Sequence, residues 1–253
     1  MNIKTNNGFK LENGVHVSLS IGEKFFDFEK NYLKVREKEK RVLNIEEIRK
    51  LPFVESKNAD YDLWRIRRRN INRFLNYLAK KNKQLKILDV GCGNGFFTNL
   101  MQKQSHFLMG LDVNIVELNQ AVEAFGASNI TWVYGDILSD NLPENKFDII
   151  TFCGSFQYFE HPEKLLNHCK KLLHPGGEIH IIDSPFYPEA EIEAAKHRSI
   201  DYFHNMEVDT MNNYFHHNSY KIFDDYNITL KYKPNRFLRK LFKDSPFPWI
   251  MIL

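Results

Sequence analysis

Three glycines at alternate positions, just after a short apolar run, are the residues of this chain best placed for chemistry. Residues 87–90 form the apolar run, and Gly91, Cys92, Gly93 and Gly95 follow it. Glycine lets a backbone approach a ligand closely and adopt positive φ. A turn of this kind at the carboxyl end of a parallel strand binds nucleotides in open α/β sheets. A dinucleotide fingerprint would require a third glycine where Phe96 stands, so the spacing disfavours that class.

Acidic residues stand at the ends of the next two predicted strands. Residues 107–111 lead into Asp112 and Val113, and residues 130–134 are followed by Asp136 and Ile137. A carboxylate offers two adjacent oxygens, which suits the two hydroxyls of a ribose at Asp112. An acid followed by an apolar residue suits an adenine, with one group for the amine and one for the ring face. The alternative for both acids is a solvated loop position.

Strands and helices alternate along the rest of this region and must position these groups. An amphipathic helix is predicted around 115–125, and a fourth strand at 147–152 runs into Cys153, Gly154 and Ser155. A helix around 165–173 then ends at a Pro-Gly-Gly turn that leads into a strand at 178–183. This alternation predicts a doubly wound α/β fold with a mostly parallel sheet.

Five segments in this order resemble the class I S-adenosylmethionine-dependent methyltransferases of the small-molecule group. They read ILDVGCGNG, LMGLDV, WVYGDI, FDIITFCGSF and LLHPGGEIHII, and they cover about residues 86–183. The resemblance implies a Rossmann-like, seven-stranded, mostly parallel sheet with an antiparallel last strand, closed by residues 228–232 and 249–252. It also implies S-adenosylmethionine as cofactor, S-adenosylhomocysteine as product and in-line displacement as the reaction.

The same resemblance assigns a cofactor role to the motif residues. Asp89 and the loop with Gly91, Cys92, Gly93 and Gly95 would face the methionine part. Asp112, with Val113 beside it, would take the ribose, Asp136 and Ile137 the adenine, and Cys153 and Gly154 would line the pocket with backbone. For Asp89 the alternative is a cap of the following turn.

Two regions outside these motifs are expected to carry specificity. Residues 1–60 form an N-terminal extension or cap, whose charged run around 29–41 is interpreted as a solvated helix face. Residues 61–253 form the methyltransferase domain, with a helical lid inserted after strand five at about 184–227. In a helix at about 61–78, Arg67 falls inside the apolar stripe, so its guanidinium either extends to solvent or grips the methionine carboxylate. Four other arginines of this helix are expected to form a basic face: Arg65, Arg68, Arg69 and Arg73.

A general base would assist methylation of a hydroxyl, and several side chains qualify. Many relatives carry a histidine just after the fourth strand, whereas this chain has Gln157 and Tyr158 there. Tyr158, His161 and His204 are the candidates, together with two further lid histidines at 216 and 217. The alternative for Tyr158 is an aromatic wall of the cofactor pocket. Adjacent histidines are a poor ligand pair, and no metal site is predicted.

Composition argues against several classes of protein. The 253 residues carry 35 basic and 32 acidic side chains, and a net charge of +3 is too small to indicate nucleic-acid binding. The three cysteines are widely spaced and fit a reducing compartment. The first residues lack the apolar core of a signal peptide, and no stretch approaches the ~20 apolar residues of a membrane span. We therefore expect a cytoplasmic protein without a membrane partner.

The prediction is O-methylation of a small or medium organic acceptor. The end of the fourth strand reads Cys-Gly-Ser-Phe rather than the Asp/Asn-Pro-Pro-Tyr of enzymes that methylate nucleic-acid bases. Two alternatives stay open. One is a non-catalytic S-adenosylmethionine-binding interaction protein, and the other is a methyltransferase for a phosphorylated or nucleic-acid acceptor, bound through the arginine-rich helix.

Overall fold

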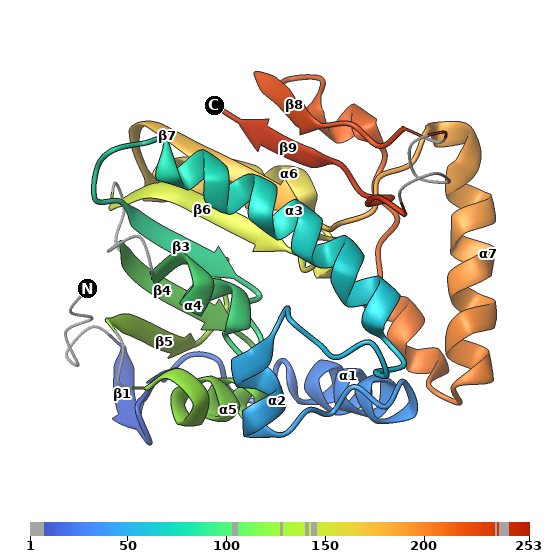
Figure 1. Ribbon diagram of the computed structural model, residues 1–253, viewed down its shortest axis with the longest axis horizontal. Coiled ribbons are helices and arrows are strands. Elements are labelled where there is room, and N and C mark those ends of the chain that lie inside the picture. The colour runs from blue at the N-terminus through green and yellow to red at the C-terminus, as the bar shows by residue number, and fades with distance from the viewer. Residues whose placement is uncertain are drawn as a thin grey trace.

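A single mixed sheet organises the protein (Figure 1). The computed structural model describes residues 8–102, 106–126, 129–139, 142, 146–235, 237 and 243–253. Within them the sheet has nine strands in the order β1-β2-β5-β4-β3-β6-β7-β9-β8. The strands are β1 (Phe9–Glu12), β2 (Val15–Ser18), β3 (Lys86–Val90), β4 (Phe107–Asp112), β5 (Ile130–Tyr134), β6 (Phe147–Cys153), β7 (Leu173–Ile182), β8 (Ile228–Tyr232) and β9 (Trp249–Ile252).

The seven strands from β5 to β8 form the predicted sheet. Neighbours from β5 through β7 pair in parallel, and β9 runs antiparallel to both β7 and β8. The α/β fold with an antiparallel last strand is thus confirmed. The hairpin β1-β2 adds two strands that the prediction left out of the sheet, because β2 pairs in parallel with β5. Without this hairpin β5 would be an open edge.

Helices cover both faces of the sheet. They are α1 (Phe26–Lys38), α2 (Ile45–Lys50), α3 (Tyr61–Ala79), α4 (Phe96–Gln102), α5 (Ile115–Phe125), α6 (Pro162–Leu172) and α7 (Glu189–Asn205), with short 3₁₀ helices η1 (Phe156–Tyr158), η2 (Asp209–Asn213) and η3 (Tyr220–Phe223). Successive residues of β3 point to opposite faces: Ile87 packs with α3 and α4, and Leu88 packs with α6. Burial on both faces explains the continuous apolar run of the strand.

The N-terminal segment and the insertion after β7 pack against each other. Phe28 and Val35 of α1 share a buried cluster with Phe203 of α7 and with Val208 and Met211. Residues before and after position 60 therefore contribute to one structure, and the division at residue 60 stays a prediction. In the described part of the chain, none of the helices has the length and apolarity needed to cross a bilayer.

Candidate active site

A cavity of about 530 Å³ opens beyond the carboxyl ends of β3, β4, β5 and β6. Its size lies within the range of ~300–1,000 Å³ typical of ligand pockets, and its position is where open α/β sheets bind ligands. Seven of the predicted cofactor residues line it: Gly91, Gly93, Asp112, Val113, Asp136, Ile137 and Gly154.

Two positions of the glycine-rich loop have no space for the Cβ of any other residue. Gly91 has φ +71°, and a Cβ there would lie 2.3 Å from Cβ of Ser155. Gly95 has φ +76°, and its Cβ would lie 2.4 Å from the ring of Trp132. Gly91 therefore lets Ser155 pack against the loop, and Gly95 lets Trp132 of β5 pack behind it. Neither Gly95 nor the buried Cys92 is among the residues that line the cavity.

Asp89 lies beneath the loop rather than in the cavity wall. Its side chain is 1% exposed, and its two oxygens accept hydrogen bonds from Thr98 Oγ1 at 2.6 Å and Thr151 Oγ1 at 2.8 Å. Burial raises the pKa of Asp89 to about 6, although the two hydroxyls lower it. The structure therefore shows Asp89 tying the start of α4 to β6, and its predicted contact with the cofactor stays a prediction.

Asp112 lies in the cavity wall with both carboxylate oxygens oriented by backbone groups. The backbone N–H of Gly93 donates to Oδ2 at 2.7 Å, and that of Asn114 donates to Oδ1 at 2.8 Å. Each oxygen keeps a second lone pair, so a pair of neighbouring hydroxyls can donate to it. Burial raises the pKa of Asp112 to about 6.

Asp136 occupies the next strand end and is held by the N-terminal segment. Lys24 Nζ lies 2.6 Å from Oδ2, Ser139 Oγ donates to the same oxygen at 2.9 Å, and the backbone N–H of Leu138 donates to Oδ1 at 3.0 Å. Ile137 is 1% exposed and presents an apolar surface beside it. The lysine was not anticipated, because its pairing depends on the fold of residues before α1.

The charged run around residues 29–41 is a solvated face only in part. Glu29 is 8% exposed and caps α5, since its Oε1 accepts from the backbone N–H groups of Ile115 at 2.9 Å and Val116 at 3.4 Å. Tyr32 lines the cavity, and Arg36 donates to its hydroxyl at 2.7 Å. The prediction holds for the exposed residues of the run and fails at Glu29, because α5 covers this part of α1 and the insertion covers Val35. The exposed residues are Lys30, Lys34, Glu37, Lys38 and Lys40.

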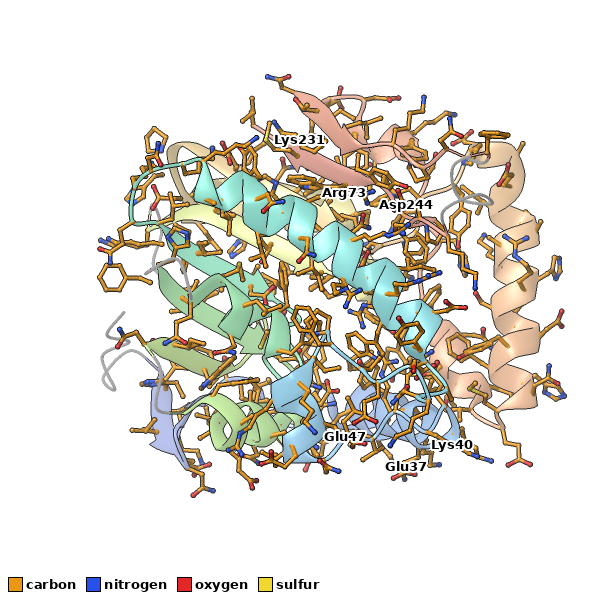
Figure 2. All side chains as sticks on the ribbon, viewed as in Figure 1. Glu37, Lys40, Glu47, Arg73, Lys231 and Asp244 are labelled. Atoms are coloured by element: carbon orange, nitrogen blue, oxygen red, sulfur yellow. The ribbon has the colours of Figure 1, made fainter. Side chains whose placement is uncertain are left out.

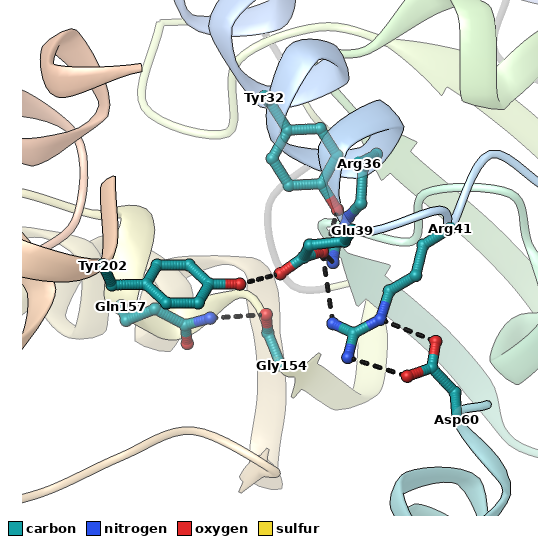
Figure 3. Close-up of polar contacts among 8 residues, drawn as sticks. All are labelled: Tyr32, Arg36, Glu39, Arg41, Asp60, Gly154, Gln157 and Tyr202. Carbon is teal, nitrogen blue, oxygen red and sulfur yellow. Dashed lines mark hydrogen bonds and ion pairs between the residues drawn. The ribbon is translucent and has the colours of Figure 1, made fainter. Parts of the chain in front are cut away.

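A carboxylate on α1 joins the N-terminal segment to the insertion (Figure 3). Glu39 accepts from Arg36 Nη1 at 2.8 Å and from the hydroxyl of Tyr202 on α7, and it pairs with Arg41 at 3.2 Å. Arg41 in turn donates to Asp60 through Nε at 2.9 Å and Nη2 at 3.2 Å. These contacts bring residues far apart in sequence to one side of the site.

Arg67 and Cys153 lie next to the cavity but are not among its lining residues. The guanidinium of Arg67 lies 3.5 Å from Asp183 Oδ2 and stacks over the ring of Trp64 at 4.8 Å. A Cβ on Gly154 would lie 3.5 Å from Arg67 Nη2, so the arginine points toward the cavity wall rather than outward. The thiol of Cys153 is buried, which raises its pKa well above its usual range.

The structure separates the three catalytic candidates. Tyr158 lines the cavity and contacts Phe28 and Tyr32 edge-on, with ring centroids 5.6 and 5.8 Å apart. His161 lines the mouth and is exposed. His204 is not among the residues that line the cavity, and its Nδ1 lies 3.0 Å from Asp209 Oδ1. We therefore do not propose it as a catalytic residue.

His216 is the lid histidine that the fold brings into the site. It lines the cavity, and its backbone N–H donates to the carbonyl of Gln157 at 2.8 Å. Burial lowers the pKa of its imidazole, although Glu160 raises it. No grouping of three or more metal-ligating side chains occurs in the described part of the chain.

Known proteins resemble this chain in its central part. Residues 87–177 match the family model described as "Methyltransferase domain". A malonyl-[acyl-carrier protein] O-methyltransferase 1 of Ilyobacter polytropus is 33% identical over 106 residues, which are 41% of this chain and 39% of that protein. A ubiquinone biosynthesis O-methyltransferase of Pasteurella multocida is 30% identical over 120 residues, which are 42% of this chain and 50% of that protein. The chain thus matches half or less of the length of these relatives.

A solved structure covers more of the fold. The plantazolicin methyltransferase BpumL in complex with SAH aligns with 90% of this chain and 98% of its own, at a TM-score of 0.50 and 18% identity. The identity is low, so this likeness bears on the fold alone. The fold and the family match agree: residues 87–177 match a methyltransferase domain, and the chain has the Rossmann-like fold of such methyltransferases.

Proposed function

We propose that the protein transfers a methyl group from S-adenosylmethionine to a hydroxyl or carboxyl oxygen of a small or medium organic acceptor. The observation that carries this proposal is one cavity that joins two kinds of wall. One wall is made by Gly91, Asp112 and Asp136, and the other by the aromatic rings of Tyr32 and Tyr158. The O-methyltransferases among the relatives support an oxygen acceptor.

The residues present fit the family's cofactor. Gly91 and Gly93 line the cavity with backbone that carries no Cβ, which suits close approach of a ligand. Asp112 would take the ribose hydroxyls, and Asp136 with Ile137 would take the adenine. Gly91, Gly93 and Gly154 would face the methionine part, with Arg67 behind Gly154. When bound there, the cofactor supplies a methyl group activated by its sulfonium.

The chain's own groups would then orient and deprotonate the acceptor. Holding the acceptor close and aligned supplies most of the advantage in such a displacement. His216 is the proposed base, because a partly buried, neutral imidazole can take the hydroxyl proton near neutral pH. Burial raises the pKa of Tyr158, so its phenol stays protonated and serves as wall or hydrogen-bond donor.

The first test is calorimetric titration with S-adenosylmethionine, S-adenosylhomocysteine and NAD. Wild-type protein should bind the first two and not NAD. Asp112→Ala should abolish that binding, and Asp209→Ala, outside the cavity, should leave it intact. Binding of NAD alone, or of none of the three, would overturn the proposal.

The second test concerns the base. With labelled cofactor and a panel of phenols and carboxylic acids, His216→Asn should lower kcat about 100-fold or more while the cofactor still binds. The matched change His204→Asn should leave kcat within about twofold. Equal losses in both variants would remove His216 from the mechanism.

Two of the four arginines expected to form a basic face on the arginine-rich helix have acidic partners, which weakens the case for a phosphorylated or nucleic-acid acceptor. Arg73 pairs with Asp244 at 2.6 Å, and Figure 2 shows the two side chains side by side. Arg65 pairs with Asp62 at 3.2 Å. A steep loss of acceptor binding with added salt would restore that alternative.

The cytoplasmic location stays a prediction.

A further inference from the structure

Glu117 is a carboxylate in the cavity wall to which the proposed chemistry gives no role. It stands in the first turn of α5, where its backbone N–H donates to the side chain of Asn114 at 3.0 Å. Its Oε2 lies 2.8 Å from the point where a Cβ on Gly93 would be. The carboxylate therefore lies directly over the backbone of the glycine-rich loop and faces the cavity.

The surroundings of Glu117 leave its negative charge without a close counter-ion. Asp112 and Glu29 add negative charge nearby, and the two cations that attract it are already committed: Arg36 to Glu39 and Arg67 to Asp183. Within the described residues, no salt bridge includes Glu117. The other titratable groups that interact with it are neutral: Tyr32, Tyr158 and Cys92.

Burial and the neighbouring Asp112 together raise the pKa of Glu117 to about 7. A carboxylate in this situation is stabilised by any cation that enters the cavity, because an opposite charge within a few ångströms favours the ionised form. Asp136 already has such a partner in Lys24. Within the described residues neither Glu117 nor Asp112 has a cation partner, but two backbone N–H groups donate to Asp112, so Glu117 is the acid whose charge a ligand cation would balance.

We propose that Glu117 forms a cation subsite of the cofactor pocket and binds a positively charged group of S-adenosylmethionine, either the ammonium or the sulfonium. This inference rests on the proposed function, since it assumes that this cofactor occupies the cavity. It predicts that the pocket favours the charged methionine portion of the cofactor beyond what the adenosine portion contributes.

Three ligands separate the two cationic groups. S-adenosylmethionine carries both the ammonium and the sulfonium, S-adenosylhomocysteine carries the ammonium only, and 5′-methylthioadenosine carries neither. Their affinities are measured by calorimetry at about pH 8 for wild type, Glu117→Gln and Glu123→Gln. Glu123 is exposed on the same helix, so its variant is a matched control.

We expect Glu117→Gln to weaken binding of S-adenosylmethionine about tenfold or more, as for loss of a contact between opposite charges, and to leave binding of 5′-methylthioadenosine unchanged. An equal loss for S-adenosylhomocysteine assigns the ammonium, and an unchanged affinity for it assigns the sulfonium. Equal losses for all three ligands, or none, would overturn the subsite. Failure of wild type to bind S-adenosylmethionine would instead overturn the proposed function.

Proton release provides an independent readout. Binding of a cation beside Glu117 lowers the pKa of its carboxyl, so near pH 7 the wild type should release protons as the cofactor binds. Titrations in buffers of different ionisation enthalpy measure this release. Glu117→Gln should release fewer protons than wild type, whereas a merely structural glutamate would leave the count unchanged.

Discussion

Replacing Glu117 by glutamine should stabilise the cofactor-free protein in a pH-dependent way. Burial and Asp112 raise the pKa of this carboxyl from 4.5 to about 7. Between these two values the folded protein holds more protons than the unfolded chain. The stabilisation contributed by Glu117 is therefore fully present below about pH 4.5 and is lost as the pH rises through about 7.

The size of the effect follows from the shift. About 2.5 pKa units at 1.36 kcal/mol each give roughly 3 kcal/mol of lost stability above pH 7. Glutamine keeps the shape of the side chain and has no charge to bury. Relative to wild type, Glu117→Gln should therefore gain up to about 3 kcal/mol on going from pH 4.5 to 8, or roughly 6–12 °C in Tm.

Urea unfolding followed by circular dichroism at about pH 5 and about pH 8 measures this gain. The relevant quantity is the difference between the two pH values, because a constant packing effect of the substitution cancels in it. Glu123→Gln should show no such difference, since that side chain is exposed. If the stability gap between Glu117→Gln and wild type is the same at both pH values, the buried-charge reasoning is refuted.

Three further substitutions test the packing around the site. Gly95→Ala should lower stability by about 2 kcal/mol or more in urea unfolding, because the residue has φ +76° and its Cβ would meet an indole ring of β5; an unchanged midpoint would contradict the described loop. Asn70→Ala should cost about 1–3 kcal/mol, since it removes the 2.7 Å hydrogen bond to buried Asp183, and Asn70→Asp should not restore the midpoint. Trp249→Phe should lower Tm by several degrees, as it leaves Nδ1 of buried His180 without its 3.0 Å donor; full retention of Tm would show that this bond adds nothing.

The cavity wall at the strand ends could be predicted from the sequence because its parts are local. Gly91, Asp112 and Asp136 each follow directly after an apolar strand, and the ends of parallel strands meet at one edge of a sheet. Their positions in space follow from the order of the strands alone. The parallel core follows from the same alternation, and the antiparallel last strand, which the family resemblance implied, is confirmed as well.

The residues that were missed come together only through tertiary packing. Glu29 reads as one more acid in a charged helix, yet it caps α5, which lies 86 positions further along the chain. Composition cannot show which side of α1 is covered, so Arg36 was also assigned to solvent. The sequence could not show that His216 lies in the site and His204 outside it. That difference arises because the insertion packs against Gln157, whose carbonyl accepts from the backbone N–H of His216.

One wall of the cavity lies inside the family match and the other lies outside it. This difference indicates which residues determine the acceptor. The family match spans residues 87–177 and includes Gly91, Asp112 and Asp136. Phe28, Tyr32, Tyr214 and His216 lie outside it, on α1 and on the insertion after β7, and they form much of the remaining lining. Glu39 connects these two segments through Arg36 and Tyr202. The acceptor's identity must therefore be deduced from the shape and charge of the segments outside the family match, because the wall inside the match is common to methyltransferase domains.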